Sequence, residues 1–175
     1  MPYIADFHTH SHYSYATSKH SNLVGLNNWG KIKGIQLLGT SDFTHPGWFA
    51  ELRENLVDDG NGFFKLKSDF TPDIEYIENV DLRFVLTAEI SCIYKKNDQT
   101  KKSHHILVVP DFQSVININH KLSAIGNLAS DGRPILKLSA RNLLEILLEN
   151  APEGFLIPAH IWTPWFSIFG NRSGY

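Results

Sequence analysis

The sequence predicts an α/β fold built on a mainly parallel sheet or a (β/α) barrel. Three observations support this prediction. Apolar runs of strand length alternate along the chain with runs of helical period, as they do in βαβ units. The 175 residues, of which 42% are hydrophobic, suffice for one domain with an ordinary packed core. One segment, 91–106, departs from the alternation and predicts a local hairpin.

The individual elements follow from period and end signals. The runs with strand character are 3–8, 35–40, 82–90, 104–109 and 155–161. The runs with an apolar helical face are 23–32, 46–56, 111–122 and 139–150. Pro46 suits the first turn of the second helix, and Ser139 is a good N-cap for the fourth. A polar segment with glycine and proline, 58–81, interrupts the pattern, and we expect it to be a loop over the functional site.

Composition excludes several classes of protein. The single cysteine, Cys92, permits neither an internal disulfide nor a cysteine-based zinc cluster, which suits a reducing cytoplasm. No apolar run approaches the ~20 residues that span a bilayer, and the opening MPYIAD lacks the features of a signal peptide. We therefore expect a soluble, cytoplasmic protein with no membrane association.

Charge narrows the range of partners. The formal net charge of −2 argues against a generally basic nucleic-acid binder that ignores sequence. The lysines of KKNDQTKK (95–102) leave two interpretations open. They form either a local basic patch or the solvated tip of a hairpin, and we favour the tip.

Candidate metal ligands lie at or just after the predicted strand ends. His8 and His10 follow the first strand, and their spacing puts both rings on one side of an extended chain. The other candidates are Asp42 and His45 after the second strand, Glu89 at the end of the third, His104 and His105 at the start of the fourth, and His160 at the end of the fifth. Because the C-terminal strand ends of a parallel barrel share one rim, these residues would converge on one mouth.

Each candidate also has an interpretation without metal. The histidines of ADFHTH fit the polar face of an alternating strand equally well. Asp42 alone is typical of a turn former, and Glu89 of an exposed or capping carboxylate. Because side chains alternate in a strand, at most one of His104 and His105 can face the site. The remaining histidines are expected at the surface or around the site: His12, His20 and His120.

The combination of ligand types indicates a reaction. Histidine and carboxylate ligands without cysteine suit zinc, manganese or iron, and a glutamate can bridge two such ions. Two or three ions about 4 Å apart would activate water and stabilise both the attacking and the leaving oxygen of a phosphate ester. Hydrolysis of a phosphoester is therefore the predicted reaction.

The chain combines HTH after a strand, TSDFTH, the glutamate of TAEIS, the histidine of KSHHILVVP, and PAH. Together these motifs resemble the polymerase-and-histidinol-phosphatase (PHP) family of metal-dependent phosphoesterases. The longer runs TSKHSNL, GTSDFTHPGW, TAEISCIY, SDGRPIL and IPAHIWTPWFSIFG are similar to its endonuclease Q subfamily, bacterial and archaeal enzymes that nick DNA 5′ to deaminated bases. The resemblance extends over the whole chain.

The resemblance implies a PHP-type distorted (β/α)7 barrel, formed as a single domain by residues 1–175. It implies zinc or manganese, in two to three ions, with magnesium as an alternative for activity. The implied ligands are His8, His10, Glu89, His104 and His160 for the first two ions, with Glu89 bridging, and Asp42 or His45 for a third. Glu89 and Asp42 would be the catalytic residues. The implied substrate is DNA that contains deaminated bases (uracil, hypoxanthine or xanthine) or abasic sites.

The sequence departs from the family pattern at several points. Phe43 and Thr44 separate Asp42 from His45, where the family has the two adjacent. HYSYATSKH offers no obvious further ligand after the first motif, and no Asp-x-His motif follows His160. We therefore expect an incomplete barrel that lacks the family's last strands and zinc module. Its open sheet edge favours self-association or low solubility.

Two further motifs concern DNA. WTPWF places Trp162, Trp165 and Phe166 either against an extruded base of a duplex or in the core near the barrel mouth, and we favour the core. SDGRP either forms a turn or lets Arg133 contact a phosphate. The candidate DNA contacts are thus Trp162, Trp165 and Arg133.

Three functions follow from these observations. The first is a metal-dependent DNA endonuclease that acts beside damaged bases in DNA repair. The second is a small-molecule phosphatase of the same fold, and the third is a truncated, catalytically silent domain that binds metal. We predict the first.

Overall fold

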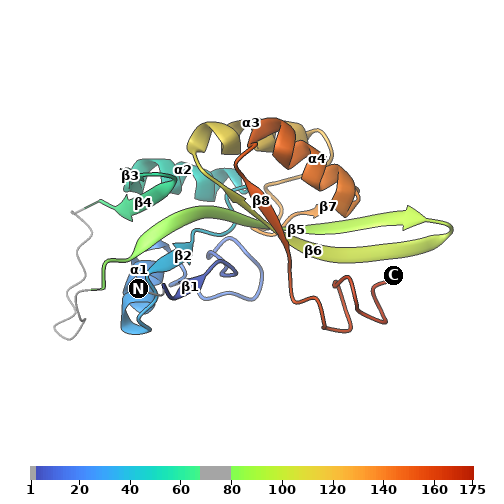
Figure 1. The fold of residues 1–175 in the computed structure, drawn as a ribbon, viewed down its shortest axis with the longest axis horizontal. Helices are drawn as coiled ribbons and strands as arrows, with labels where there is room; N and C mark the ends of the chain where they lie inside the picture. Colours follow the sequence, from blue (N-terminus) through green and yellow to red (C-terminus); the bar gives the residue numbers. More distant parts are fainter. Residues whose placement is uncertain (1–2, 68–79) are drawn as a thin grey trace.

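The computed structural model describes residues 3–67 and 80–175. Figure 1 shows one long ribbon crossed by shorter elements. In chain order the elements are β1 (Ala5–Asp6), α1 (Leu23–Ile32), β2 (Leu37–Gly39), α2 (Pro46–Asn55), β3 (Leu56–Gly60), β4 (Phe63–Leu66), β5 (Arg83–Lys96), β6 (Gln99–Val109), α3 (Phe112–Ser123), β7 (Ile135–Leu136), α4 (Ala140–Asn150) and β8 (Phe155–Pro158). The chain is therefore mixed α/β, as the alternation of strand and helix predicts.

The sheet is open, and among the described strands it is not mainly parallel. β5 lies at its centre, parallel to β2 and β7 and antiparallel to β4 and β6, while β6 is antiparallel to β8. The prediction of a mainly parallel sheet is wrong because two antiparallel connections contribute most of the pairing. These are the β5–β6 hairpin, which is longer than predicted, and the β3–β4 hairpin, which falls partly in the segment expected to be a loop. The described strands do not close into a barrel.

Side chains alternate along β5, so that one face packs in the core and the other carries residues of the candidate site. Its even-numbered residues from Phe84 to Cys92 all belong to the main hydrophobic cluster, together with side chains of α2, α3 and α4. Its odd-numbered residues lie on the opposite face, which we call the site face. Thr87, Glu89 and Ser91 are buried on this face. One strand thus supplies both the packed core and the base of the candidate site.

The helices begin and end close to the predicted positions. Asn22, Asp111 and Ser139 cap α1, α3 and α4, and each side chain accepts a hydrogen bond from a backbone N–H of the first turn. α2 begins at Pro46, whose fixed φ suits the first turn. Leu122 of α3 and Leu147 of α4 are fully buried against the sheet, and each contributes about 1.5–3 kcal/mol of hydrophobic stabilisation. In Figure 1, α3 and α4 cover one side of the β5–β6 ribbon.

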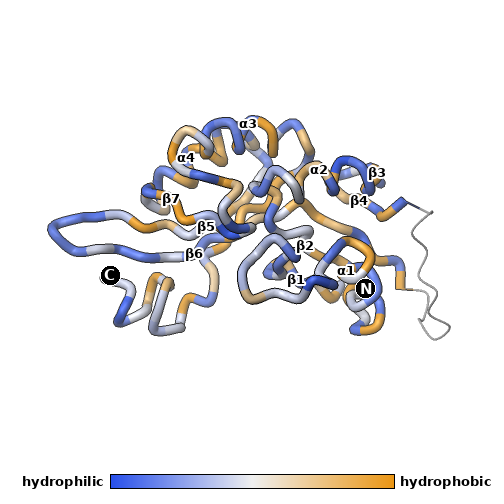
Figure 2. The backbone as a smooth tube through the Cα atoms, turned by 180° about the vertical axis from the view of Figure 1, so that it is seen from behind, coloured by the Kyte–Doolittle hydropathy of each residue, from blue (hydrophilic) through white to orange (hydrophobic). Residues whose placement is uncertain are grey.

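A segment without regular structure, residues 159–175, follows β8 along the outer part of β6. Its backbone carbonyls accept hydrogen bonds from β6: Lys102 N–H donates to Ser173 O (2.8 Å) and His104 N–H to Phe166 O (2.9 Å). Figures 1 and 2 both show this C-terminal segment beside the hairpin. It occupies part of the β6 edge that would otherwise be open to a second chain.

Two further predictions concern the segment 58–81 and membrane-spanning helices. The predicted loop 58–81 is in part the β3–β4 hairpin, and its residues 68–79 lie outside the described residues. Among the described helices, none combines the length and the apolar character needed to cross a bilayer.

Candidate metal centre

Several segments bring the candidate ligands to the site face. β1 and β2 are parallel neighbours, so the turns after them, which carry His8, His10 and Asp42, lie side by side. Glu89 lies within β5 and His104 within β6, because both strands extend further than predicted. His160 follows β8, which pairs with β6. The site is therefore built from strand interiors as well as from strand ends.

Glu89 is the centre of the arrangement. Its side chain is almost wholly buried, and three imidazole nitrogens surround its Oε1 atom. His8 Nε2 lies at 3.1 Å, His104 Nδ1 at 3.0 Å and His160 Nε2 at 3.4 Å. These rings come from the turn after β1, from β6 and from the turn after β8.

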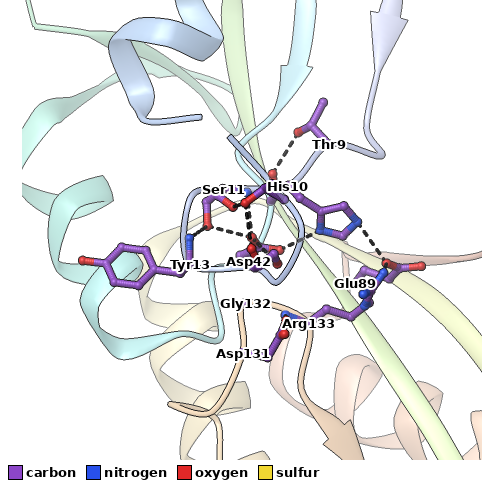
Figure 3. A network of polar contacts seen from close by, with 12 residues as sticks. Thr9, His10, Ser11, Tyr13, Asp42, Glu89, Asp131, Gly132 and Arg133 are labelled. Carbon is purple, nitrogen blue, oxygen red and sulfur yellow. Dashed lines mark hydrogen bonds and ion pairs between the residues drawn. The ribbon is translucent and has the colours of Figure 1, made fainter. Parts of the chain in front are cut away.

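The second carboxylate oxygen of Glu89 faces a different set of groups. His10 Nε2 lies 3.2 Å from Oε2, and the guanidinium of Arg133 lies 3.6 Å from it. His10 Nδ1 in turn lies 3.2 Å from Oδ1 of Asp42. Figure 3 shows His10 between the two carboxylates, with Arg133 reaching Glu89 from the 131–133 turn.

Asp42 is held by donors on both of its oxygens. Oδ2 accepts hydrogen bonds from Ser11 N–H (2.7 Å), Ser11 Oγ (2.7 Å) and Ser14 Oγ (2.9 Å). Ser41 and Asp42 both have positive φ, 56° and 46°, which is a costly conformation for residues with a Cβ. The hydrogen bonds to the buried carboxylate offset that cost. They leave Asp42 directed at His10 and shielded from the space around Glu89.

Gly132 packs directly against the Asp42 carboxylate. A Cβ on Gly132 would lie 2.4 Å from Asp42 Oδ2 and 2.5 Å from Ser14 Oγ. Only glycine lets the 131–133 turn approach so closely without displacing these groups. The same turn carries Arg133, and its conformation is fixed by Asp131, whose side chain accepts hydrogen bonds from the N–H groups of Arg133 (2.8 Å) and Tyr15 (3.2 Å).

His45 lies apart from this cluster. It is the N-cap of α2, where its Nδ1 accepts from Trp48 N–H at 3.5 Å. Its ring stacks on Tyr13 with the centroids 4.2 Å apart. Of the two alternatives in TSDFTH, the structure thus brings Asp42, and not His45, into contact with the other candidates.

Three of the four histidines around Glu89 have a partner at the ring nitrogen that points away from it. Besides the His10–Asp42 contact, His104 Nε2 lies 3.1 Å from Ser91 Oγ, and His160 Nδ1 lies 3.0 Å from Thr163 Oγ1. A far nitrogen that donates its proton in this way leaves the nitrogen near Glu89 with a lone pair that could bind a metal ion. Such outer partners are typical of metal-binding histidines, because they fix both the tautomer and the ring orientation.

The charges at the site follow from burial and from these contacts. Burial alone would raise the pKa of Glu89, but His10, His104 and His8 hold that pKa well below its ordinary value. Burial alone would lower the pKa of His10, but Asp42 and Glu89 raise it to about 9. Burial lowers the pKa of His160. The protein without metal therefore has an anionic Glu89 beside a protonated His10.

The other histidines do not join the cluster. His105 lies on the core face of β6, within hydrogen-bond distance of Ser103 Oγ (2.8 Å), and burial lowers its pKa to about 4. His12 Nε2 lies 3.5 Å from Glu51, and its ring packs against Trp48. The remaining two, His20 and His120, are exposed.

The donor set fits a divalent cation. His8, Glu89 and His160 each place one ligand atom within 4.8 Å of the other two. Both Glu89 oxygens are buried and lack a hydrogen-bond partner, although imidazole nitrogens lie close to them. The protonated His10 supplies one positive charge in the absence of metal, and a divalent cation among the imidazole nitrogens would neutralise this buried carboxylate more fully. Nitrogen and carboxylate ligands of this kind suit zinc or manganese.

A hollow of about 630 Å³ adjoins the cluster. Ser91, His104 and Ile135 line it from the strands, Arg133 from the turn before β7, and Phe166 from the C-terminal segment. Two of its lining residues, His104 and Arg133, also contact Glu89.

The predicted aromatic contacts lie on the surface and not in the core. Trp162 is 79% exposed and stacks on Phe169 with centroids 4.7 Å apart. Trp165 is 50% exposed, and the guanidinium of Arg172 lies 4.9 Å from its ring centroid. Phe166 packs against the His104 ring at 4.5 Å. The preference for core packing is therefore wrong for both tryptophans.

Comparison with solved structures gives a clear likeness. The chain is similar to endonuclease Q. It superimposes on the lesion-specific endonuclease PfuEndoQ of Pyrococcus furiosus with a TM-score of 0.75 and 31% sequence identity, over 94% of this chain and 36% of that one. A structure of Endonuclease Q with a 27-mer duplex substrate, which has an abasic lesion at the active site, gives a TM-score of 0.74 and 30% identity over the same shares.

Sequence comparison adds one relative. An uncharacterized protein of Methanocaldococcus jannaschii is 27% identical over 160 residues, which are 91% of this chain and 16% of that protein. No family's sequence profile matches the chain. The chain thus spans about a third of the solved endonucleases and a sixth of the archaeal relative.

Sequence reasoning missed the groups that support the histidines. Ser11 and Ser14 hold Asp42, Gly132 closes over them, and Ser91 and Thr163 hold the rings of His104 and His160. One signal was available: Ser91 lies two residues after Glu89 and so on the same face of its strand. The other four depend on the paths of turns, which residue spacing does not reveal.

Proposed function

We propose that this chain provides the metal centre of a DNA-repair endonuclease, which hydrolyses a phosphodiester bond beside a deaminated base or an abasic site. One observation carries the proposal: both oxygens of the buried Glu89 face imidazoles from three separate segments. The similarity to two structures of endonuclease Q, one of them solved with a duplex, supports DNA as the substrate.

The residues that would hold metal are grouped around Glu89. His8, His104 and His160 would hold one ion together with Glu89, and His10 and Glu89 would contribute to holding a second. Zinc or manganese suits this nitrogen-rich set better than magnesium, which prefers oxygen ligands. Bound ions of this kind lower the pKa of water and stabilise charge on phosphate oxygens.

Asp42 and His45 have other roles in this proposal. Asp42 already accepts hydrogen bonds on both oxygens, so it orients His10 rather than binding a third ion. His45 caps α2, and we propose no metal-binding role for it. The catalytic carboxylate is therefore Glu89 alone, and the proposed centre holds two ions.

The protein's own groups would position the DNA. Arg133 reaches Glu89 from the adjoining hollow and would bind a phosphate oxygen there. Trp162 and Trp165 are exposed just after His160, where bases of an opened duplex would stack on them. Thr163, whose Oγ1 contacts His160 Nδ1, would keep the His160 ring in place while DNA is bound.

We also propose that residues 1–175 form a single PHP-type domain. A continuous sheet joins the strands before and after the segment 68–79, and one main cluster contains residues of both parts. Unfolding in one cooperative transition is the expected behaviour. Two separate transitions would contradict the single domain.

A nicking assay tests the function. A labelled duplex with one hypoxanthine or one abasic site is incubated with the purified chain and manganese or zinc. We expect a nick beside the lesion, with Glu89→Gln at least about 100-fold slower. Glu149→Gln makes the same change on the exposed side of α4 and should leave the rate unchanged.

Each other outcome has a defined meaning. Equal cleavage by Glu89→Gln would contradict the metal centre. Equal cleavage of a duplex without damage would contradict lesion specificity. Hydrolysis of p-nitrophenyl phosphate without nicking would favour a small-molecule phosphatase. Bound metal without activity on either substrate would favour a silent domain.

A further inference from the structure

The site face continues past Glu89 along the β5–β6 hairpin and becomes basic. Ser91↔His104 and Ile93↔Lys102 are directly opposed pairs, so their side chains share one face with Glu89. Lys95 lies on the same face, since it is six residues after Glu89 in a strand of period two. The adjacent lysines, Lys96 and Lys101, lie on the opposite face by the same alternation.

The hollow described above adjoins this strip, because Ser91 and His104 belong to both. Arg133 and Phe166 line the same hollow. The Lys102 ammonium lies 5.8 Å from the centroid of the Phe166 ring. We use the name hairpin groove for this hollow together with Lys102 and Lys95.

The groove is positive although the chain is not. The formal net charge of the protein is −2, yet the groove carries Arg133, Lys102 and Lys95. One acidic side chain, Asp131, also lines the hollow, where it accepts two backbone hydrogen bonds, and Asp98 lies at the tip of the hairpin. Local cations on a projecting element attract a polyanion even when the overall charge is negative. Figure 2 shows the outer hairpin as hydrophilic.

We propose that the hairpin groove binds the phosphodiester backbone of one DNA strand and leads it to Glu89. Successive side chains on one face of a strand are about 6.6 Å apart, so Lys102 and Lys95 extend the contact stepwise away from the metal centre. Arg133 holds the phosphate nearest Glu89, and the exposed part of Phe166 faces the base side. The identity of the partner as DNA rests on the proposed function, whereas the path along the hairpin does not.

Adjacent lysines on opposite faces provide a matched test. Lys95→Gln and Lys96→Gln remove the same charge from neighbouring exposed residues of β5, but only Lys95 lies in the groove. Binding of a fluorescein-labelled duplex with one abasic site is measured by anisotropy in EDTA, so that no cleavage occurs. The measurement is repeated between about 50 and 200 mM salt, because phosphate contacts are salt-dependent.

We expect Lys95→Gln and Lys102→Gln each to weaken binding about threefold to tenfold and to lower the slope of log K against log salt by ~0.9. Lys96→Gln should stay within about twofold of the unchanged protein. Lys102→Arg should restore the affinity, which separates loss of charge from loss of packing on Phe166. Circular dichroism confirms that each variant is folded.

Three results would contradict the proposal that the groove binds DNA. They are equal weakening of duplex binding by Lys95→Gln and Lys96→Gln, unchanged duplex binding by Lys102→Gln, and no duplex binding by the unchanged chain at the lowest salt. Failure of the proposed function looks different. In that case the duplex binds with the expected dependence on lysine but is not nicked with any metal.

Discussion

Replacement of Asp42 by alanine tests whether the carboxylate or the surrounding packing fixes the first turn of the site. The side chain is fully buried and accepts from Ser11 N–H, from the hydroxyls of Ser11 and Ser14, and from His10. Each hydrogen bond to a charged group contributes about 1.5–3 kcal/mol, and each buried donor left unpaired costs about 1–3 kcal/mol. Because the terms overlap, we expect Asp42→Ala to lower the free energy of unfolding by about 3–5 kcal/mol.

Urea unfolding in EDTA, followed by circular dichroism, measures that free energy without a contribution from bound metal. A loss of this size should lower Tm by roughly 6–20 °C for a chain of this length. Glu149→Ala removes an exposed carboxylate from α4 and should change the free energy by no more than about 0.5 kcal/mol. If Asp42→Ala lowers the free energy of unfolding by less than about 1 kcal/mol, the hydrogen bonds to Asp42 do not fix the turn, and the reasoning is refuted.

Three further predictions concern the same centre. The pKa of His10 is raised to about 9, so its contribution to stability is present below about pH 6.5 and is lost as the pH rises through 9; urea unfolding in EDTA should show this loss, and His10→Gln should not. The double variant His8→Ala/His160→Ala should lose bound zinc or manganese in elemental mass spectrometry, while the exposed His120→Ala keeps it; equal metal content would contradict the ligand set. Gly132→Ala should weaken metal binding at least about tenfold in a chelator competition and destabilise the fold by about 1–3 kcal/mol, because its Cβ would meet a carboxylate oxygen at 2.4 Å; an unchanged affinity would show that the turn can shift.

The helices could be predicted from the sequence because their signals are local. Asp111 and Ser139 cap α3 and α4 where the sequence predicts their first turns. The direction of the strands could not be predicted in this way. The predicted strand 82–90 ends at Ile90, yet β5 continues to Lys96, because pairing with β6 holds polar residues in a strand that their composition does not favour. Tertiary pairing decided the length of the hairpin and hence the antiparallel character of the sheet.

The residues of the candidate site show the same difference between what the sequence predicts and what it does not. Alternation alone predicts that only one of His104 and His105 faces Glu89, and the structure places His104 there. The choice between Asp42 and His45 depended on the path of a turn with two consecutive positive φ values, which no spacing rule indicates. Residues within a strand were therefore easier to assign than residues in the turn after it.

The two faces of β5 also determine how mutations act on the protein. A register shift of one residue would exchange the faces, so a single deletion before Glu89 would place the carboxylate among apolar side chains and turn Ile90 toward the site face. Substitutions need not have this double effect. In a saturation scan of β5, abundance would fall at even positions and ligand binding at odd ones, with a period of two. Evolution can therefore change the chemistry of this strand without changing its packing, provided that its length stays constant.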